Sequence, residues 1–398
     1  MTLLAWLDDR TATDRALVGT KFASLAEVRR WPIEDRPQMP PGAALTTGAW
    51  HRVVERNGLA PLVAAGMSGD ETAERSLEQA LAHAELPADV IDACSSVVGE
   101  LTATGGAVAV RSSAVAEDLE GRTFAGQYLT RLSVHGVEAA ADAYRACLAS
   151  AWRAGPRRYR VRTADGSPDD PAMAVIVQAM AHDGDGWAGA ALTDGSGGVT
   201  VEVVRGLGAE LMSGRADPLR WTVAGGEHPE GDLALQVVEW CRRAEQRCGH
   251  AVEIEFAVRS DAPTPLLLQL RAHRSDEAVR AGAGRWSSPS GDVNGLAIGR
   301  GTVRGPVCRL DGPDEMERLV AGGVLVTTAT DPAWLPLLAG LGAVVTDHGG
   351  LTSHAAIVCR ELGILAVVGC GDATRRLVDG QRVEVRCDGT TGAVSPIS

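Results

Sequence analysis

The sequence has almost no lysine. Of its 38 basic residues only Lys21 is a lysine, and the others are arginines. A phosphate-binding loop of the G-K-[ST] type needs a lysine between a glycine and a hydroxyl residue, whereas Lys21 lies between Thr20 and Phe22. A protein kinase or a Schiff-base enzyme would also have to use this one side chain. The scarcity of lysine therefore argues against all three classes.

The sequence also lacks the patterns of metal, redox, secretory and membrane segments. Its 8 cysteines form no C-x-x-C pair and no Cys/His spacing of a zinc site. They are expected to be reduced and mostly buried thiols. The N-terminus has no basic segment of a secretory signal, and no uncharged apolar run approaches the roughly 18 residues that span a bilayer. We therefore expect a soluble, cytoplasmic protein with no membrane partner.

Positive charge is outnumbered by negative charge. The 38 basic and 51 acidic side chains give a formal charge of −13, which argues against nucleic acid as a partner. A small anion would have to be held by a local cluster of positive groups. With 398 residues, 45% of them hydrophobic and 22% charged, the composition is that of a globular chain with more than one domain.

Helical and strand patterns alternate along the chain, which predicts an α/β and α+β fold. Residues 276–294 are rich in Ala, Gly, Ser and Arg and have no apolar period, so they predict a flexible linker. The linker would separate a domain of residues 1–275 from a smaller domain of residues 295–398. Helices are expected at 71–85, 88–103, 136–153 and 232–248, and strands at 107–110, 172–178, 199–204, 252–258 and 265–270.

The most informative segment lies in the smaller domain. Gly349 and Gly350 free the backbone before a predicted helix whose first turn carries Thr352, Ser353 and His354. Hydroxyl side chains there can cap open amide groups, and the helix dipole favours an anion on the imidazole. A histidine in this position can carry a phosphoryl group. The alternative is a histidine that only makes local hydrogen bonds at a helix start.

Residues 349–364 resemble the phosphohistidine signature of the PEP-utilising enzymes, the family of phosphoenolpyruvate synthase, pyruvate phosphate dikinase and rifampicin phosphotransferase. The likeness extends upstream through residues 330–336 and downstream through residues 366–369. The resemblance implies that His354 carries a phosphoryl group. It also implies that residues 295–398 form a small swivelling β/β/α phosphohistidine domain.

The larger domain resembles the ATP-grasp-like nucleotide-binding domain of the same family. Residues 18–25 are similar to its V-G-G-K-x-x-S-L segment, which implies that Lys21 contacts ATP phosphates. A second similar segment contains Arg111, Thr123 and Gly126. An arginine directly after a buried strand can present its planar fork to phosphate, and small residues let loop amides approach it. The alternative for Arg111 is a strand-edge ion pair with Glu117 or Asp118.

Residues 176–180 resemble the family segment that lines the adenine pocket. The resemblance implies that Gln178 and Met180 contact the nucleotide. The alternative is that this apolar strand with a terminal methionine is only part of the core.

A turn-rich segment between the strands at 252–258 and 265–270 predicts a hairpin. Glu255 and Gln269 on adjacent strands would make a hard-oxygen site for Mg²⁺, with Arg271 beside it for phosphate. These strands resemble the D-I-E-W and L-Q-A-R segments of the family. The alternative is a cross-strand ion pair between Arg271 and a glutamate.

The resemblance implies a relay in two steps. ATP is split at the larger domain, His354 is charged, and the small domain swivels to an acceptor. Lys21, Arg111 and Arg271, together with Mg²⁺, would neutralise charge on the transferring group. By resemblance the products are AMP and orthophosphate or pyrophosphate.

The motifs do not specify the acceptor. Because the chain ends at Ser398, we expect no (β/α)₈ barrel for pyruvate and no drug-binding insert. Our first hypothesis is a dikinase-type phosphotransferase acting on a hydroxyl of a small metabolite or antibiotic, and the acidic balance would suit a cationic acceptor. The second is a charging subunit of a split PEP synthase or pyruvate dikinase, whose phosphohistidine is used by a separate barrel protein, the acceptor protein, to make PEP from pyruvate. The third is a non-catalytic nucleotide-sensing module, which need not keep all of these residues.

Overall fold

A computed structural model describes residues 2–103, 106–115, 118–119, 122–123, 128–153, 171–225, 232–262, 264–272, 292–338 and 340–397. They form two compact units, and each is described by itself. Unit 1 contains Met1–Asp183 and Thr264–Arg271, and unit 2 contains Gly184–Pro263 and Ala272–Ser398. The predicted domain 1–275 is divided between the two units, because residues 184–263 belong to unit 2. The limits of that domain stay a prediction. The predicted linker 276–294 lies outside the described residues up to residue 291.

Unit 1 is built on an antiparallel sheet with the strand order β1-β2-β7-β3-β6. Its strands are β1 Leu4–Trp6, β2 Gly42–Leu45, β7 Met173–Ala179, β3 Val108–Ala114 and β6 Thr130–Val134. A separate pair consists of β4 Asp118–Leu119 and β5 Arg122–Thr123, and β12 Pro265–Ala272 also contributes to this unit. The inner strand β3 is buried along its whole length, so side chains at its end lie inside the fold.

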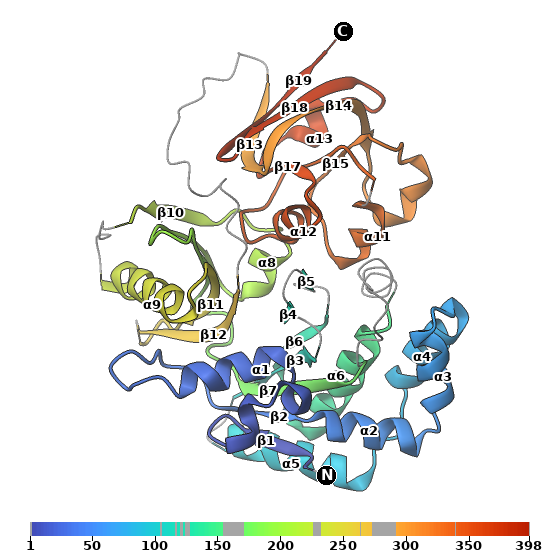
Figure 1. Ribbon diagram of the computed structural model, residues 1–398, viewed down its shortest axis with the longest axis vertical. Helices are drawn as coiled ribbons and strands as arrows, with labels where there is room; N and C mark the ends of the chain where they lie inside the picture. The colour runs from blue at the N-terminus through green and yellow to red at the C-terminus, as the bar shows by residue number, and fades with distance from the viewer. Residues whose placement is uncertain are drawn as a thin grey trace. The chain divides into compact units, whose positions relative to one another are not determined.

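Helices cover this sheet (Figure 1). Those that pack on its strands are α1 Arg15–Arg29, α2 Thr47–Arg56, α5 Ala88–Leu101 and α6 Gly136–Ser150. Helix α4 Glu71–Ala82 packs on α6, and α3 Ala60–Met67 packs on α4. Helix α4 begins where Asp70 accepts hydrogen bonds from the amides of Thr72 and Ala73, as expected for an acidic N-cap. Apolar side chains of α2, α4, α5 and α6 pack against the valines of β3 and β7 and form the core of the unit.

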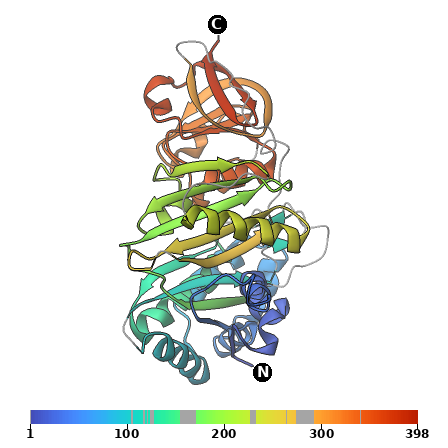
Figure 2. The ribbon, with the colours of Figure 1, turned by 90° about the vertical axis from the view of Figure 1, so that its left-hand side faces the viewer.

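Unit 2 contains a second antiparallel sheet and a closed barrel. In the sheet, the strands β10 Leu219–Val223, β9 Val199–Arg205, β8 Trp187–Thr193 and β11 Val252–Val258 are neighbours in that order. Helix α9 Asp232–Cys248 lies along one face of this sheet (Figure 2), and the short helix α8 Gly208–Met212 follows β9. The sheet therefore carries a helical turn directly after one of its central strands.

The barrel has the strand order β13-β17-β16-β15-β14-β18-β19 and closes between β19 and β13. Its strands are β13 Val293–Ile298, β14 Arg300–Arg309, β15 Val324–Thr327, β16 Ala343–Thr346, β17 Leu365–Val368, β18 Arg382–Asp388 and β19 Thr391–Pro396. Strands β14 to β17 are parallel, and the other pairs are antiparallel. Alternate valines such as Val383 and Val385 fill the interior, as the period of two on a strand requires.

The parallel strands of the barrel are connected by the short helices α11 Leu335–Leu338 and α12 His354–Leu362 and by 3₁₀ turns at Pro313–Arg318 and Pro332–Trp334. The short helix α13 Ala373–Arg376 lies between β17 and β18. The predicted α/β and α+β fold is confirmed. No helix among the described residues has the length and apolar character needed to cross a membrane.

Candidate functional site

The segment around Lys21 is fixed to the end of strand β3. Helix α1 is kinked at Gly19, whose φ is 70° and ψ is 168°. The Ser113 hydroxyl donates to the carbonyl of Val18 at 2.8 Å and accepts from the amide of Phe22 at 3.2 Å. Lys21, between these anchors, is only 9% exposed. The kink and the two bonds therefore hold the only lysine of the chain close to β3.

Arg111 lies on the same strand, two residues before Ser113. Its Nη1 donates to the carbonyl oxygen of Leu268 and its Nη2 to Oε1 of Gln269, both at 2.7 Å. These two acceptors are neutral groups, and together they orient the planar guanidinium. Arg271 follows two residues after Gln269 and shares its face of β12. The structure thus connects Lys21, Arg111, Gln269 and Arg271 through β3 and β12.

The predicted adenine residues lie on and just after β7. Gln178 is 2% exposed, and its Nε2 donates to the carbonyl of Pro40 at 3.2 Å. The amide of Met180 donates to the carbonyl of Ala107 at 3.0 Å. Because Gln178 pairs with Ala109 of β3, it lies one strand away from Arg111. Unit 1 therefore places Arg111 and Gln178 on the neighbouring strands β3 and β7, while Lys21 lies on α1.

Three predicted nucleotide residues are not placed in this group. Gly126 lies outside the described residues, and only the backbone of Thr123 is described, in β5. Glu255 lies on β11, in unit 2, whereas Gln269 belongs to unit 1. The joint use of Glu255 and Gln269 as metal ligands therefore stays a prediction. The predicted alternative for Arg111 also stays open, because the side chains of residues 117 and 118 are not described.

A lysine in place of Arg111 tests the two-bond contact. The lysine side chain keeps the positive charge, but a single ammonium group cannot span the carbonyl of Leu268 and the amide of Gln269. We expect Arg111→Lys to lower the free energy of unfolding by about 1–3 kcal/mol and to weaken ATP binding. Urea unfolding and ATP titration measure these effects. The exposed Arg131 of β6 provides the control Arg131→Lys; equal losses in both variants would contradict the assignment.

His354 is the first residue of α12. The Ser353 side chain caps this helix by accepting from the amide of Ala356 at 3.4 Å, as predicted for a hydroxyl in the first turn. Nδ1 of His354 is hydrogen-bonded to Oγ1 of Thr330 at 2.9 Å. Nε2 is buried and has no hydrogen-bond partner among the described residues. One ring nitrogen is thus fixed by Thr330, and the other remains for chemistry.

The surroundings of His354 favour a neutral imidazole. The residue is 4% exposed. Burial lowers its pKa from 6.5 to about 4, because the charged form would lose its hydration. A neutral imidazole has a lone pair on one nitrogen and can act as a nucleophile above about pH 4.

This burial predicts a loss of stability in acid. As the pH falls from about 6.5 towards 4, the unfolded chain takes up a proton at His354 while the folded chain does not. Stability is therefore fully present above pH 6.5 and is lost as the pH approaches 4. Between about pH 7 and 4 the wild type should lose about 3 kcal/mol more than His354→Asn. Urea unfolding across this range measures the difference, and parallel losses in the two proteins would contradict it.

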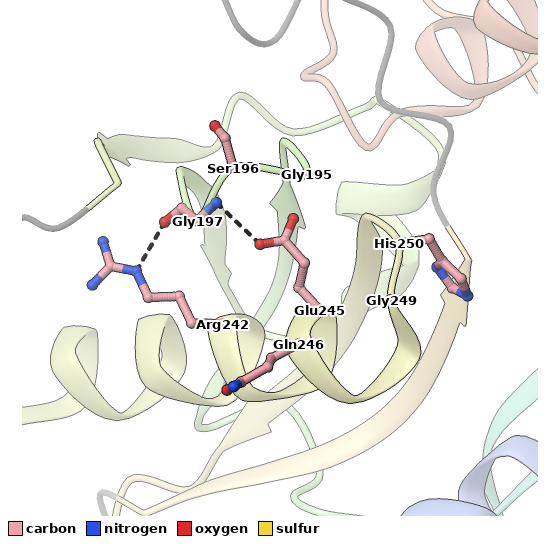
Figure 3. A pocket seen from close by; sticks show the side chains of 8 residues that line it. All are labelled: Gly195, Ser196, Gly197, Arg242, Glu245, Gln246, Gly249 and His250. Carbon is pink, nitrogen blue, oxygen red and sulfur yellow. Dashed lines mark hydrogen bonds between the residues drawn. The ribbon is translucent and has the colours of Figure 1, made fainter.

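A pocket of about 500 Å³ in unit 2 contains none of the predicted residues. It lies between the β8–β9 turn and α9 (Figure 3). Across it, the amide of Gly197 donates to Glu245 at 3.1 Å, and Nε of Arg242 donates to the Gly197 carbonyl at 2.8 Å. These bonds fasten the turn to the helix, so we assign the pocket a structural role.

Comparison with known proteins identifies both parts of the chain. Residues 15–232, more than half of the chain, match the pyruvate phosphate dikinase AMP/ATP-binding domain. The chain belongs to the PEP-utilising enzyme family. Residues 319–392 match the mobile domain of PEP-utilising enzymes. His354 lies in the mobile domain, and Lys21, Arg111, Thr123, Gly126, Gln178 and Met180 lie in the AMP/ATP-binding domain.

Several relatives in this family carry the name phosphoenolpyruvate synthase. The protein of Neisseria meningitidis serogroup B is 30% identical, over 98% of this chain and 57% of its own length. The protein of Pseudomonas aeruginosa is 31% identical, over 98% of this chain and 57% of its own length. The protein of Aeropyrum pernix is 29% identical, over 98% of this chain and 58% of its own length. The chain therefore spans 57% to 58% of the length of these relatives.

The residues that sequence reasoning did not single out are Thr330, Glu202 and Arg220. Thr330 lies in the upstream part of the phosphohistidine likeness, and its bond to His354 connects residues 24 positions apart. Glu202 lies on β9 and contacts the loop before His354. Its signal in the sequence is a single acidic residue among the apolar and β-branched residues that precede the terminal Arg205 of the strand.

Proposed function

We propose that the chain is an ATP-dependent dikinase-type phosphotransferase that passes a phosphoryl group from ATP through His354 to an acceptor. The observation that supports this most directly is the state of the His354 ring. Thr330 fixes Nδ1, whereas Nε2 has no partner among the described residues and the imidazole is neutral above about pH 4. This is the arrangement that a nitrogen nucleophile needs.

In the proposed first step, Nε2 of His354 forms a bond to the β-phosphorus of ATP. The bond from that phosphorus to the oxygen shared with the α-phosphate breaks, and AMP leaves with the bonding electrons. The terminal phosphoryl group is transferred to water or to phosphate, which gives orthophosphate or pyrophosphate. In the second step the phosphoryl group passes from Nε2 to an oxygen of the acceptor.

In this proposal Lys21, Arg111 and Arg271 bind the phosphates of ATP. Each is less than a tenth exposed, so their charges act with little screening by water. Arg111 is pre-oriented by Leu268 and Gln269, and Lys21 by the anchors on Ser113. Gln178 and Met180 would contact the adenine.

Magnesium would be held by Glu255 and Gln269. Oε1 of Gln269 accepts one hydrogen bond from Arg111, and an amide oxygen has a second lone pair for a cation. A carboxylate and an amide oxygen are donors that Mg²⁺ prefers. When bound, the ion neutralises charge on the phosphates and on the transferring group.

Two acceptors remain within the proposal. The first is a hydroxyl of a small metabolite or antibiotic, for which the formal charge of −13 favours a cationic molecule. The second is pyruvate, bound by a separate acceptor protein, and the name of the relatives supports it. Incubating the charged protein with metabolite pools, with and without pyruvate and a candidate acceptor protein, distinguishes them by the mass of the phosphorylated product.

The first step is tested without knowledge of the acceptor. The protein is incubated with Mg²⁺ and ATP labelled at the β-phosphate. We expect stoichiometric AMP and a labelled protein whose label is lost in acid and kept in alkali, as for a phosphoramidate. Binding of ATP without AMP and without label would support the nucleotide-sensing alternative instead.

A further inference from the structure

Inside unit 2, a buried carboxylate binds the loop that leads into His354. Glu202 of β9 is 0% exposed. Its Oε1 accepts from the amide of Leu351 at 2.8 Å, and its Oε2 accepts from the amide and the hydroxyl of Thr352 at 3.0 and 2.6 Å. The bonds to both backbone amides fix the main chain itself, immediately before the helix that begins with His354.

Arg220, on the neighbouring strand β10, holds this carboxylate from the sheet side. Arg220 is the direct cross-strand partner of Glu202, and its Nε and Nη2 donate to Oε1 at 2.6 and 2.5 Å. A buried carboxylate is costly unless its oxygens are fully hydrogen-bonded. Arg220 of the sheet donates some of the hydrogen bonds to the Glu202 carboxylate, and Leu351 and Thr352 of the loop donate the others. Removal of the loop would therefore leave the carboxylate with only its sheet partner.

Glycines permit the close approach on both sides. A β carbon at Gly350 would lie 2.3 Å from Oε1 and 2.5 Å from Oε2 of Glu202. On the sheet side, the turn after α8 places Gly214 against Ser353, where a β carbon would lie 3.0 Å from that of the serine. The sequence predicts that Gly350 gives the backbone freedom before the helix. The structure shows a second role: the absence of a side chain leaves space for the Glu202 carboxylate.

The contact joins the two matched domains of the family. Glu202, Gly214 and Arg220 lie within the AMP/ATP-binding match at 15–232. Leu351 and Thr352 lie within the mobile-domain match at 319–392. Figure 1 shows α8 beside α12 within unit 2, in agreement with the Gly214–Ser353 contact. A bond network between these domains can set where His354 is held.

We propose that Glu202, oriented by Arg220, is a positioning residue that holds the His354 loop on the AMP/ATP-binding domain during charging. Glu202 does not touch the reacting atoms and acts through the amides of Leu351 and Thr352. The inference rests on the proposed function, since the position of His354 matters only if this residue accepts phosphate. Charge-assisted bonds suit a contact that must form and break, because they are specific in direction and exchange readily for water.

The test compares Glu202→Gln with the matched change Glu384→Gln. Glu384 also pairs with an arginine, Arg304 at 2.6 Å, but within the barrel. An amide side chain at position 202 places an NH₂ group where a carboxylate oxygen accepts from Leu351 or Thr352. In Glu202→Gln, hydrogen exchange at these amides should rise about tenfold or more, since one charge-assisted bond exceeds about 1.4 kcal/mol. Glu384→Gln should leave their exchange unchanged.

The second readout is single-turnover charging of His354. Because Glu202 positions the loop and does not bind ATP, Glu202→Gln should lower the maximal rate constant about tenfold or more. The ATP concentration at half-maximal rate should stay within about twofold of the wild type. A purely structural defect would disturb both quantities, whereas Glu384→Gln should change neither.

The variant Gly350→Ala tests the same contact by a change in the loop instead of in Glu202. The added methyl group would displace the Glu202 carboxylate, so this variant should reproduce the higher exchange and the lower rate constant at unchanged ATP half-saturation. Gly99→Ala is its control, because a β carbon at Gly99 meets no atom within 4 Å.

The outcomes separate this inference from the proposed function. Unchanged exchange at Leu351 and Thr352, or a rate constant within about twofold of the wild type in Glu202→Gln, would overturn the positioning role. If the wild type itself forms no phosphoprotein, the proposed function fails. The positioning role then fails with it, while raised exchange in Glu202→Gln still establishes the contact as a separate result.

Discussion

Replacement of His354 by asparagine is expected to abolish the acid-labile phosphoprotein, with a loss of at least about a thousandfold in its rate of formation. Removal of the proposed nucleophile leaves no group to receive the phosphoryl group, whereas the charge stabilisation that we propose for Lys21 and Arg111 is unaffected. Asparagine is chosen because its amide can still hydrogen-bond to Thr330, which holds Nδ1 in the wild type at 2.9 Å. Label on the protein after incubation with β-labelled ATP measures the effect.

The matched control is His250→Asn. His250 is exposed, lies in the same unit, and is far from the phosphohistidine loop in the sequence. Its substitution should leave charging within about twofold of the wild type. ATP binding should be retained in both variants, because neither residue is among those that we propose to bind ATP or Mg²⁺. Undiminished label on His354→Asn would show that another residue carries the phosphoryl group and would refute the relay.

The fold was most predictable where a pattern is local. The strands at 199–204 and 252–258 occur as β9 and β11, and the predicted helix 232–248 is α9 within the same limits. The helix predicted at 71–85 ends earlier, as α4 at Ala82. The apolar period of a sequence does not indicate where a helix ends. In the structure α4 ends before His83, because that residue has a non-helical conformation.

The closure of the barrel could not be predicted in this way. Strand β13 pairs with β19, so residues near 293 lie against residues near 394. Nothing in the short segment Val293–Ile298 specifies a partner about a hundred residues away, because strand pairing depends on tertiary packing. The short strand Gly42–Leu45 was not predicted, for a similar reason. Its sequence, Gly-Ala-Ala-Leu, has low strand propensity, and it forms a strand because it pairs with β1 and β7.

In the candidate site, too, the features that are local in the sequence were predictable and the contacts between distant segments were not. His354 was predictable because the glycines, hydroxyl residues and helix start are consecutive, and the cap of Ser353 is confirmed. The partners of the site residues were not, because they come from distant segments: Thr330 for His354, Gln269 for Arg111, and Ser113 for the Lys21 segment. Local motifs thus specify chemistry, while the geometry that tunes it comes from the fold.

Gly19→Ala should have the largest effect on stability, with a loss of more than about 4 kcal/mol in unit 1. Gly19 forms the kink of α1 with φ at +70°, a conformation that alanine rarely adopts. Its β carbon would lie 1.9 Å from the carbonyl oxygen and 2.4 Å from the carbonyl carbon of Ser113. These are backbone atoms of the buried inner strand β3, so they cannot move aside as a flexible side chain could.

Gly58→Ala separates the clash from the backbone strain. Gly58 has a similar φ of +61°, but a β carbon there meets no atom within 4 Å. The strain alone should cost about 1–2 kcal/mol. Urea unfolding followed by the fluorescence of Trp50 and Trp152, which lie in the core of unit 1, reports both losses.

The same comparison tests the link between the kink and ATP. Ser113 holds the segment on both sides of Lys21 through Val18 and Phe22, so displacement of Gly19 must also displace the lysine. Gly19→Ala should therefore lose ATP binding in any fraction that remains folded, while Gly58→Ala binds ATP as the wild type does. Equal stability of the two variants would contradict the clash, and normal ATP affinity of folded Gly19→Ala would contradict the role of Lys21.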